Sequence, residues 1–206
     1  MLYKFKKRRM YSYNKEITQT HNKWFEYAGL IAQTSDMLFR LGCVSTFGGK
    51  MIAYGCNTKN TYSRNDNFCD FSCSCHAEIT VIRKTIKILG ENKMKKVNLY
   101  VARMDSNNKF QNSAPCFDCM RQIKRLKIKN IIFKDDISIK IVNPVYYDTE
   151  HRTFGYYYLK SVQTSQVIQR KQNLKITQNK KKKQVNDKNK KCNNKCCCKK
   201  NYFLIE

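Results

Sequence analysis

Two short motifs decide the fold of this chain: HAE at residues 76–78 and PCFDC at residues 115–119. An imidazole and two thiolates are ligands that suit zinc in proteins. Three protein ligands leave one corner of a tetrahedral site open, as a catalytic zinc requires and a closed structural zinc does not. The sequence therefore predicts a catalytic Zn²⁺ site with three ligands: His76, Cys116 and Cys119.

The acid of the first motif, Glu78, completes the predicted chemistry. It stands two residues after a ligand and is not needed as one, so its carboxylate can lie beside the open corner and move protons. One alternative is a closed structural site whose fourth ligand is Cys69, Cys73 or Cys75. These three cysteines are also candidates for part of a second, structural metal site.

Apolar residues recur at helical spacing after each motif and predict two helices that begin at the ligands. Unpaired N–H groups and the positive end of the helix dipole favour negative charge at a helix N-terminus, which lowers the cost of neighbouring thiolates. The apolar residues are Ile79, Val81, Ile82, Ile86 and Leu89 after the first motif, and Met120, Ile123, Leu126 and Ile128 after the second.

The remaining pattern predicts one α/β domain. A helix is expected first, then a hairpin that turns at Gly48-Gly49, because a glycine pair tolerates the positive φ of tight turns. Two buried strands follow, which we expect to be parallel by the right-handed crossover rule. The predicted ranges are 21–38 for the helix, 43–47 and 51–56 for the hairpin, and 97–103 and 130–134 for the strands.

The end of the domain carries one further strand signal. Only Asp135-Asp136 separates residues 130–134 from the alternating apolar residues of 137–141. A parallel pair needs a crossover of about a dozen residues, so this last core strand must pair antiparallel. The tyrosine-rich stretch 146–159 predicts one more strand or a capping hairpin.

Charge is distributed unevenly over the 206 residues, whose net charge is +26. Residues 160–206 alone carry a net +12 among Lys, Asn, Gln and Cys, so we predict a disordered tail. It can be a polyanion-binding arm or a nuclear address, or reflect a coding bias toward Lys and Asn. We therefore divide the chain into a basic extension at 1–20, a domain at 21–159 and this tail.

No apolar run is long enough to span a membrane, and the basic N-terminus lacks the apolar region of a secretory signal. Eleven cysteines and a predicted thiolate site favour a reducing compartment, cytoplasmic or nuclear. A mitochondrial presequence is the less favoured alternative.

The order of helix, hairpin, HAE helix, strand, PCFDC helix and strand resembles the cytidine deaminase-like superfamily over residues 24–141. The motifs match the H-x-E and P-C-x-x-C signature of zinc deaminases. The resemblance implies a three-layer α-β-α sandwich around a mixed central sheet, with the last core strand antiparallel. It also implies hydrolytic removal of an exocyclic amine by zinc-activated water, with Glu78 carrying the protons, and allows a homo-oligomer.

The same resemblance suggests residues for substrate binding. Asn57 stands where family members end the second strand with an Asn that contacts the sugar; an Asn that only turns the chain is the alternative. Ala77, between ligand and acid, is a second candidate. Lys59 and Arg64, in a long polar connection, are candidates for contact with a phosphate.

Markers of the subfamilies disagree about the substrate. Ile82-Arg83 after the HAE motif resembles tRNA adenosine deaminases, whereas the expected antiparallel strand resembles free cytidine deaminases. Lys59 and Met120 depart from the Glu and Arg of the cytidine deaminases, and Thr80 departs from the Asn of the deoxycytidylate deaminases.

The leading hypothesis is a zinc-dependent deaminase of cytosine in a nucleoside or nucleotide. One alternative is a deaminase of adenosine or cytosine in RNA or DNA, held by the basic termini. The other is a zinc-stabilised nucleic-acid-binding module that has lost catalysis, against which the retention of Glu78 speaks.

Overall fold

The computed structural model describes residues 17–59, 74–166 and 168–169. Arg64, Cys69 and Cys73 lie outside the described residues, as do most of the predicted basic extension and most of the predicted tail. Within the described ranges, no helix combines the length and the apolar character that crossing a membrane requires.

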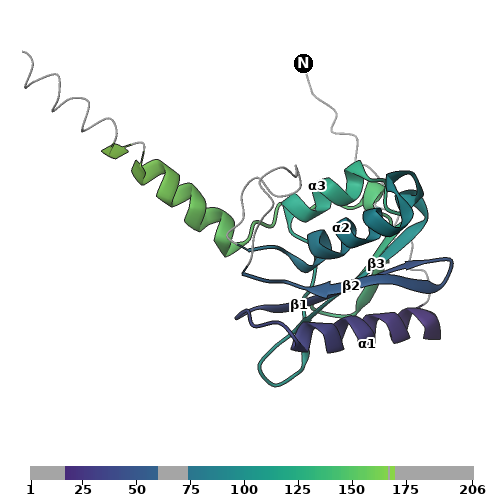
Figure 1. The fold of residues 1–206 in the computed structure, drawn as a ribbon. Helices are drawn as coiled ribbons and strands as arrows, with labels where there is room; N and C mark the ends of the chain where they lie inside the picture. The colour runs from purple at the N-terminus through teal and green to yellow at the C-terminus, as the bar shows by residue number, and fades with distance from the viewer. Residues whose placement is uncertain (1–16, 60–73, 167, 170–206) are drawn as a thin grey trace, which may run out of the picture. The chain divides into compact units, whose positions relative to one another are not determined.

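A six-stranded sheet forms the middle layer of the domain (Figure 1). Its strands lie in the order β2-β1-β3-β5-β6, and the short β4 pairs with β3 outside this row. The β3–β5 pair is parallel and the other pairs are antiparallel, so both predicted strand directions are confirmed. The strands are β1 (Arg40–Phe47), β2 (Lys50–Cys56), β3 (Val97–Met104), β4 (Phe110–Gln111), β5 (Asn130–Lys134) and β6 (Ile139–Val142).

Helices cover both faces of the sheet, α1 on one and α2 and α3 on the other (Figure 1). This confirms the predicted three-layer α-β-α sandwich around a mixed sheet. The helices are α1 (Gln19–Gln33), α2 (Ala77–Leu89) and α3 (Phe117–Arg125), with 3₁₀ turns η1 (Glu91–Lys96) and η2 (Pro144–Tyr146). Residues 154–166 and 168–169 are also helical.

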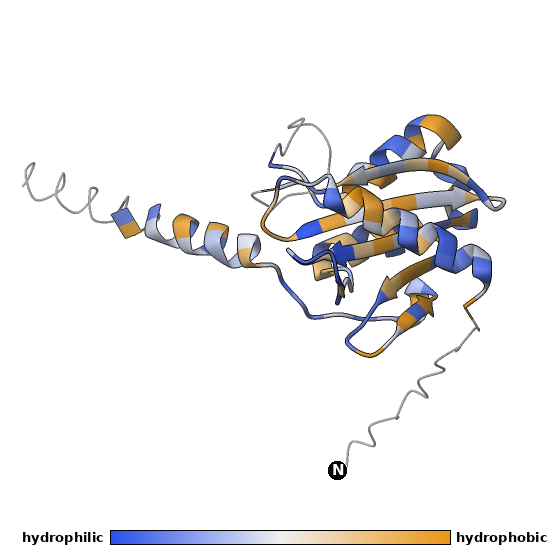
Figure 2. Cartoon of the chain, turned by 90° about the horizontal axis from the view of Figure 1, so that it is seen from below, coloured by the Kyte–Doolittle hydropathy of each residue, from blue (hydrophilic) through white to orange (hydrophobic). Residues whose placement is uncertain are grey.

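Alternation along β3 builds a separate core on each face. Leu99 and Val101 pack with α2 and α3, whereas Tyr100 and Ala102 pack with α1. All four are at most 1% exposed, and Figure 2 shows hydrophobic stretches along the strands of the sheet. A strand buried on both faces is continuously apolar, which is the pattern the sequence shows here.

Glycines set two features of the first hairpin. Gly48 and Gly49 have φ of +59° and +79°, which confirms the predicted turn. Gly42 in β1 serves close packing instead, because a Cβ there would lie 2.1 Å from the carbonyl oxygen of Ala28 in α1. The first helix therefore rests directly on the backbone of β1.

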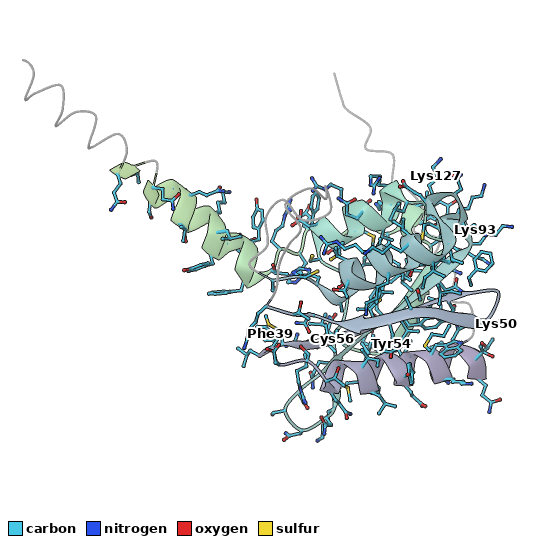
Figure 3. All side chains as sticks on the ribbon, in the orientation of Figure 1. Phe39, Lys50, Tyr54, Cys56, Lys93 and Lys127 are labelled. Atoms are coloured by element: carbon cyan, nitrogen blue, oxygen red, sulfur yellow. The ribbon has the colours of Figure 1, made fainter. Side chains whose placement is uncertain are left out.

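Strand pairing places the starts of α2 and α3 at the same end of the sheet, where β2 and β3 stop. Cys56, which ends β2, pairs with Gly42, and Met104, which ends β3, pairs with Arg40. Both motifs follow these strands, so both helices begin where the strands end. In Figure 3, Phe39 and Cys56 lie at this end of the sheet and Lys50 lies at the other.

Two expectations about secondary structure were wrong. The first helix ends at Gln33 rather than at residue 38, because Thr34 closes it with bonds to the carbonyls of Ile31 and Ala32, and Leu38 beyond it is 90% exposed. The stretch 146–159 forms no strand or hairpin. It contains the end of η2 and the start of the helix at residue 154, so its tyrosines reflect composition rather than strand alternation.

Replacing Gly42 by alanine is expected to destabilise the fold by about 3 kcal/mol, near the upper end of the range for overpacked cores. The new Cβ would meet backbone atoms of Ala28 and Ala32, which cannot turn aside. Gly29→Ala is the matched control, because its nearest neighbour is the Phe110 ring, which can shift, and alanine favours a helix by about 1 kcal/mol. Urea unfolding measures both; equal losses would contradict the packing argument.

Candidate metal and catalytic site

The three predicted ligands lie together. Nδ1 of His76 is 3.2 Å from Sγ of Cys119 and 3.4 Å from Sγ of Cys116. All three donor atoms lie within 4.8 Å of one another, and they form the cluster of potential metal ligands found among the described residues. The structure thus brings donor atoms from two distant motifs close together.

This donor set fits zinc. Tetrahedral zinc at about 2.1 Å from nitrogen and 2.3 Å from sulfur separates those two ligand atoms by about 3.6 Å. The two nitrogen–sulfur distances here are close to that value. One imidazole and two thiolates also match the ligand preferences of zinc, and three of them leave a fourth position for a water or a substrate.

Both ligand groups stand at helix N-termini, as predicted. His76 is the N-cap residue of α2 and Cys116 is the N-cap residue of α3. Neither side chain makes a capping hydrogen bond to its helix. The imidazole and the thiol therefore point toward each other and do not cap their helices. The positive ends of both helix dipoles also face the cluster.

The protein atoms alone make an ion pair of these ligands. Hydrogen bonds from Cys119 and His76, together with the charge of His76, outweigh burial and lower the pKa of Cys116 to about 4. Burial by itself lowers the pKa of His76, but the hydrogen bond and charge of Cys116 and the charge of Glu78 outweigh it and raise that pKa to about 9. The cluster thus holds a thiolate and calls for positive charge beside it.

Glu78 is buried next to the cluster, at 2% exposure. Among the described residues, its Oε2 has no hydrogen-bond partner. Burial raises the pKa of Glu78 and the charge of Cys116 adds to this, although the charge of His76 opposes it. A buried polar atom without a partner is costly, so an oxygen left bare beside three metal donors is suited to a water or a substrate rather than to the fold.

Cys75 does not belong to the cluster. Its sulfur accepts from Nη1 of Arg83 at 3.1 Å and lies 3.3 Å from Oγ1 of Thr80. It is thereby directed toward α2 side chains, which argues against Cys75 as a fourth ligand of a closed site. The other two cysteines weighed for that role, Cys69 and Cys73, lie outside the described residues.

Asn57 is buried at the end of β2 and holds the segment between α1 and β1. Its Oδ1 accepts from Oγ of Ser35 at 2.7 Å and from the N–H of Leu41 at 2.9 Å. Its Nδ2 donates to the carbonyl of Phe39 at 2.7 Å. These bonds leave one amide proton of Asn57 for any further partner.

The other substrate-binding candidates are placed differently. Ala77 is fully buried at the first helical position of α2, between the ligand and the acid. Lys59 pairs with Asp36 at 3.2 Å, and both side chains are more than 60% exposed, so the pair is weak and can exchange. Arg64 lies outside the described residues.

Two contributors to the site escaped the sequence analysis. Cys43 in β1 is fully buried, and burial followed by the negative charge of Glu78 raises its thiol pKa well above the usual value. The Cys43 thiol therefore stays protonated and adds no charge beside Glu78. The segment at residues 148–156 also contacts the start of α3, through Arg152 among others. No motif marks either contributor.

Comparison with solved structures gives weak similarities. A deoxycytidylate (dCMP) deaminase of cyanophage S-TIM5 in its apo form shares 21% identity, covers 53% of this chain and 78% of its own, and has a TM-score of 0.40. A cytidine deaminase of Burkholderia pseudomallei shares 16% identity over 60% of this chain and 92% of its own, with a TM-score of 0.45. A search among curated proteins found no match.

The sequence profile of one family covers more than half of the chain. The family is described as "Cytidine and deoxycytidylate deaminase zinc-binding region", and it matches residues 18–135. The match contains both motifs, all three clustered donors and Glu78, which confirms Zn²⁺ as the predicted cofactor. This chain belongs to the cytidine and deoxycytidylate deaminase family.

Proposed function

We propose that this protein is a hydrolase that removes the exocyclic amine of cytosine in a nucleoside or nucleotide, with His76, Cys116 and Cys119 holding zinc and Glu78 as the catalytic residue. The observation that carries the proposal is the bare, buried Oε2 of Glu78 beside three converging metal donors. A buried carboxylate oxygen without a partner is costly to the fold, which supports a chemical role for it.

Each group of the site has a part in this reaction. When bound, zinc supplies the Lewis acidity that makes water nucleophilic at neutral pH. Glu78 takes one proton from the attacking water and passes it to the ring nitrogen. It then takes the remaining hydroxyl proton of the substrate adduct and gives it to the exocyclic amine, which leaves as ammonia while the carbonyl forms. Its raised pKa suits a group that must both accept and return a proton, since burial makes the protonated form accessible.

Substrate recognition is assigned to four residues. Ala77 stands between ligand and acid at the first position of α2, and the remaining amide proton of Asn57 is available for a sugar hydroxyl. Lys59 and Arg64 would contact a phosphate, Lys59 by exchanging its exposed pairing with Asp36. The antiparallel β5–β6 pair favours cytosine over adenine by analogy with free cytidine deaminases.

A polynucleotide substrate is the second candidate, and the basic tail favours it. Residues 160–206 carry a net +12, a charge suited to phosphate backbones. Activity on a single-stranded oligonucleotide that falls steeply between about 50 and 200 mM salt would support this candidate. Activity confined to free nucleosides or nucleotides would exclude it.

A substrate panel tests the proposed reaction. The zinc-loaded chain is expected to release ammonia from at least one of cytidine, deoxycytidine and their monophosphates, with a mass gain of about one dalton in the product. Adenosine and a cytosine-containing oligonucleotide are the comparison substrates. Turnover of none of the cytosine compounds by a zinc-loaded protein would refute the proposal.

Glu78→Gln is expected to lower kcat about 10³-fold, within the range for loss of a general acid–base group. The amide keeps the size of the side chain but cannot shuttle protons, so zinc content should stay the same. Glu91→Gln makes the same chemical change at an exposed salt bridge to Arg125 and is the matched control. Unchanged turnover in Glu78→Gln would refute the catalytic role of Glu78. A binding module without catalysis would instead show no turnover in either protein, and nucleic-acid binding that this substitution does not change.

Cys116→Ser is expected to reduce bound zinc from one per chain to well below one, because a serine hydroxyl is a poor zinc ligand. Cys56→Ser is the control, since Cys56 does not belong to the donor cluster. Elemental analysis of both variants measures this. Two zinc ions in the unsubstituted chain would indicate the second site weighed for Cys69, Cys73 and Cys75.

A further inference from the structure

The start of α3 is held by a segment that follows the last strand. The N–H of Phe117 donates to the carbonyl oxygen of His151 at 2.9 Å. Nη1 of Arg152 donates to Oδ1 of Asp118 at 3.0 Å. Farther along the same helix, Lys124 forms an ion pair with Asp148. Two hydrogen bonds and an ion pair thus connect residues 148–152 to α3.

Arg152 makes the most extensive of these contacts. Its guanidinium carbon lies 3.7 Å from the ring centroid of Phe117 and 4.7 Å from that of Tyr156. It therefore contacts two aromatic rings while it binds a carboxylate. Its side chain is 24% exposed and that of Asp118 is 31% exposed, so solvent screens the pair less than it screens an open surface pair.

The residues that Arg152 grips lie between two metal donors. Phe117 and Asp118 are the two middle residues of the C-x-x-C turn, between Cys116 and Cys119. Their backbone sets the separation and direction of the two sulfurs. The first N–H groups of a helix have no partner within the helix, and His151 satisfies that of Phe117.

We propose that Arg152 is a positioning residue of the metal site: by binding Asp118 and stacking on Phe117, it holds the C-x-x-C turn so that both sulfurs meet the His76 nitrogen. The inference rests on the proposed zinc role of these ligands. Partners that orient metal ligands are worth about 10- to 100-fold in metal affinity. Arg152 acts through Asp118 and Phe117, the residues that it contacts in this turn.

Zinc release measures this role without reference to deamination. The full-length, zinc-loaded chain is mixed with a chromophoric chelator, and the rate of zinc transfer is followed for Arg152→Ala, Arg152→Lys and Lys124→Ala. We expect Arg152→Ala to release zinc about 10- to 100-fold faster than the unsubstituted chain. Arg152→Lys should fall between, because a lysine keeps the charge but loses the planar stack and the two-sided grip.

Lys124→Ala is the matched control. Lys124 connects the same segment to the same helix, but beyond the ligand turn, so its loss should change the release rate less than twofold. The absorption spectrum of the cobalt-substituted protein adds a readout of sulfur geometry, and it should change in Arg152→Ala alone. Should Arg152→Ala fail to fold, Asp118→Asn removes the same ion pair and is expected to speed release at least several-fold.

The outcomes separate the two proposals. Equal release rates for Arg152→Ala and Lys124→Ala, with unchanged cobalt spectra, would overturn the positioning role and leave the proposed function intact. An unsubstituted chain that holds no zinc would refute the proposed function, and the inference with it. Zinc held and released as expected, but without deamination of any cytosine compound, would overturn the substrate proposal alone.

Discussion

The structure depends on bringing two sulfurs, an imidazole and a buried carboxylate to one point. Cys116 has a pKa of about 4 and so is a thiolate, and Glu78 is buried beside it. Negative groups gathered away from water are costly unless a cation joins them. The positive ends of two helix dipoles supply part of this charge. Without a metal, the proton on His76 supplies more of it. A bound divalent ion would be the largest positive charge in the site. The fold therefore has to hold two helix N-termini at one place.

The sheet meets this requirement through its strand order. β1 lies between β2 and β3, and both of these strands stop at the same end of the sheet, where α2 and α3 begin. On the opposite face α1 rests on Gly42, which fixes β1 from behind. Asn57 fastens the connection between α1 and β1 with its side-chain amide. Its hydrogen bonds make it part of the frame of the site, whatever else its last proton contacts.

The features that follow from local chemistry could be predicted from the sequence. Helix starts at the ligands, the Gly48-Gly49 turn and the antiparallel last strand each rest on a few adjacent residues, and the structure has all three. Features that depend on distant partners could not be predicted. The bond between Asn57 and Ser35 and the uncharged Cys43 thiol beside Glu78 arise only when the strands pair. The helix that starts at residue 154 replaces an expected strand, because tyrosine content does not distinguish a helix from a strand.

Residues from two parts of the chain build the site, and only the first part carries a recognisable motif. The donors and the acid lie within residues 18–135, the part matched by the family profile. The segment that grips the ligand turn, including Arg152, lies after it. Chemistry requires fixed residue types at fixed spacing, so it leaves a motif that a sequence reader can find. Positioning requires only that some group bind Asp118 and cover Phe117, which a different segment could do with different residues. The geometry of the two sulfurs therefore depends on residues that no deaminase motif specifies.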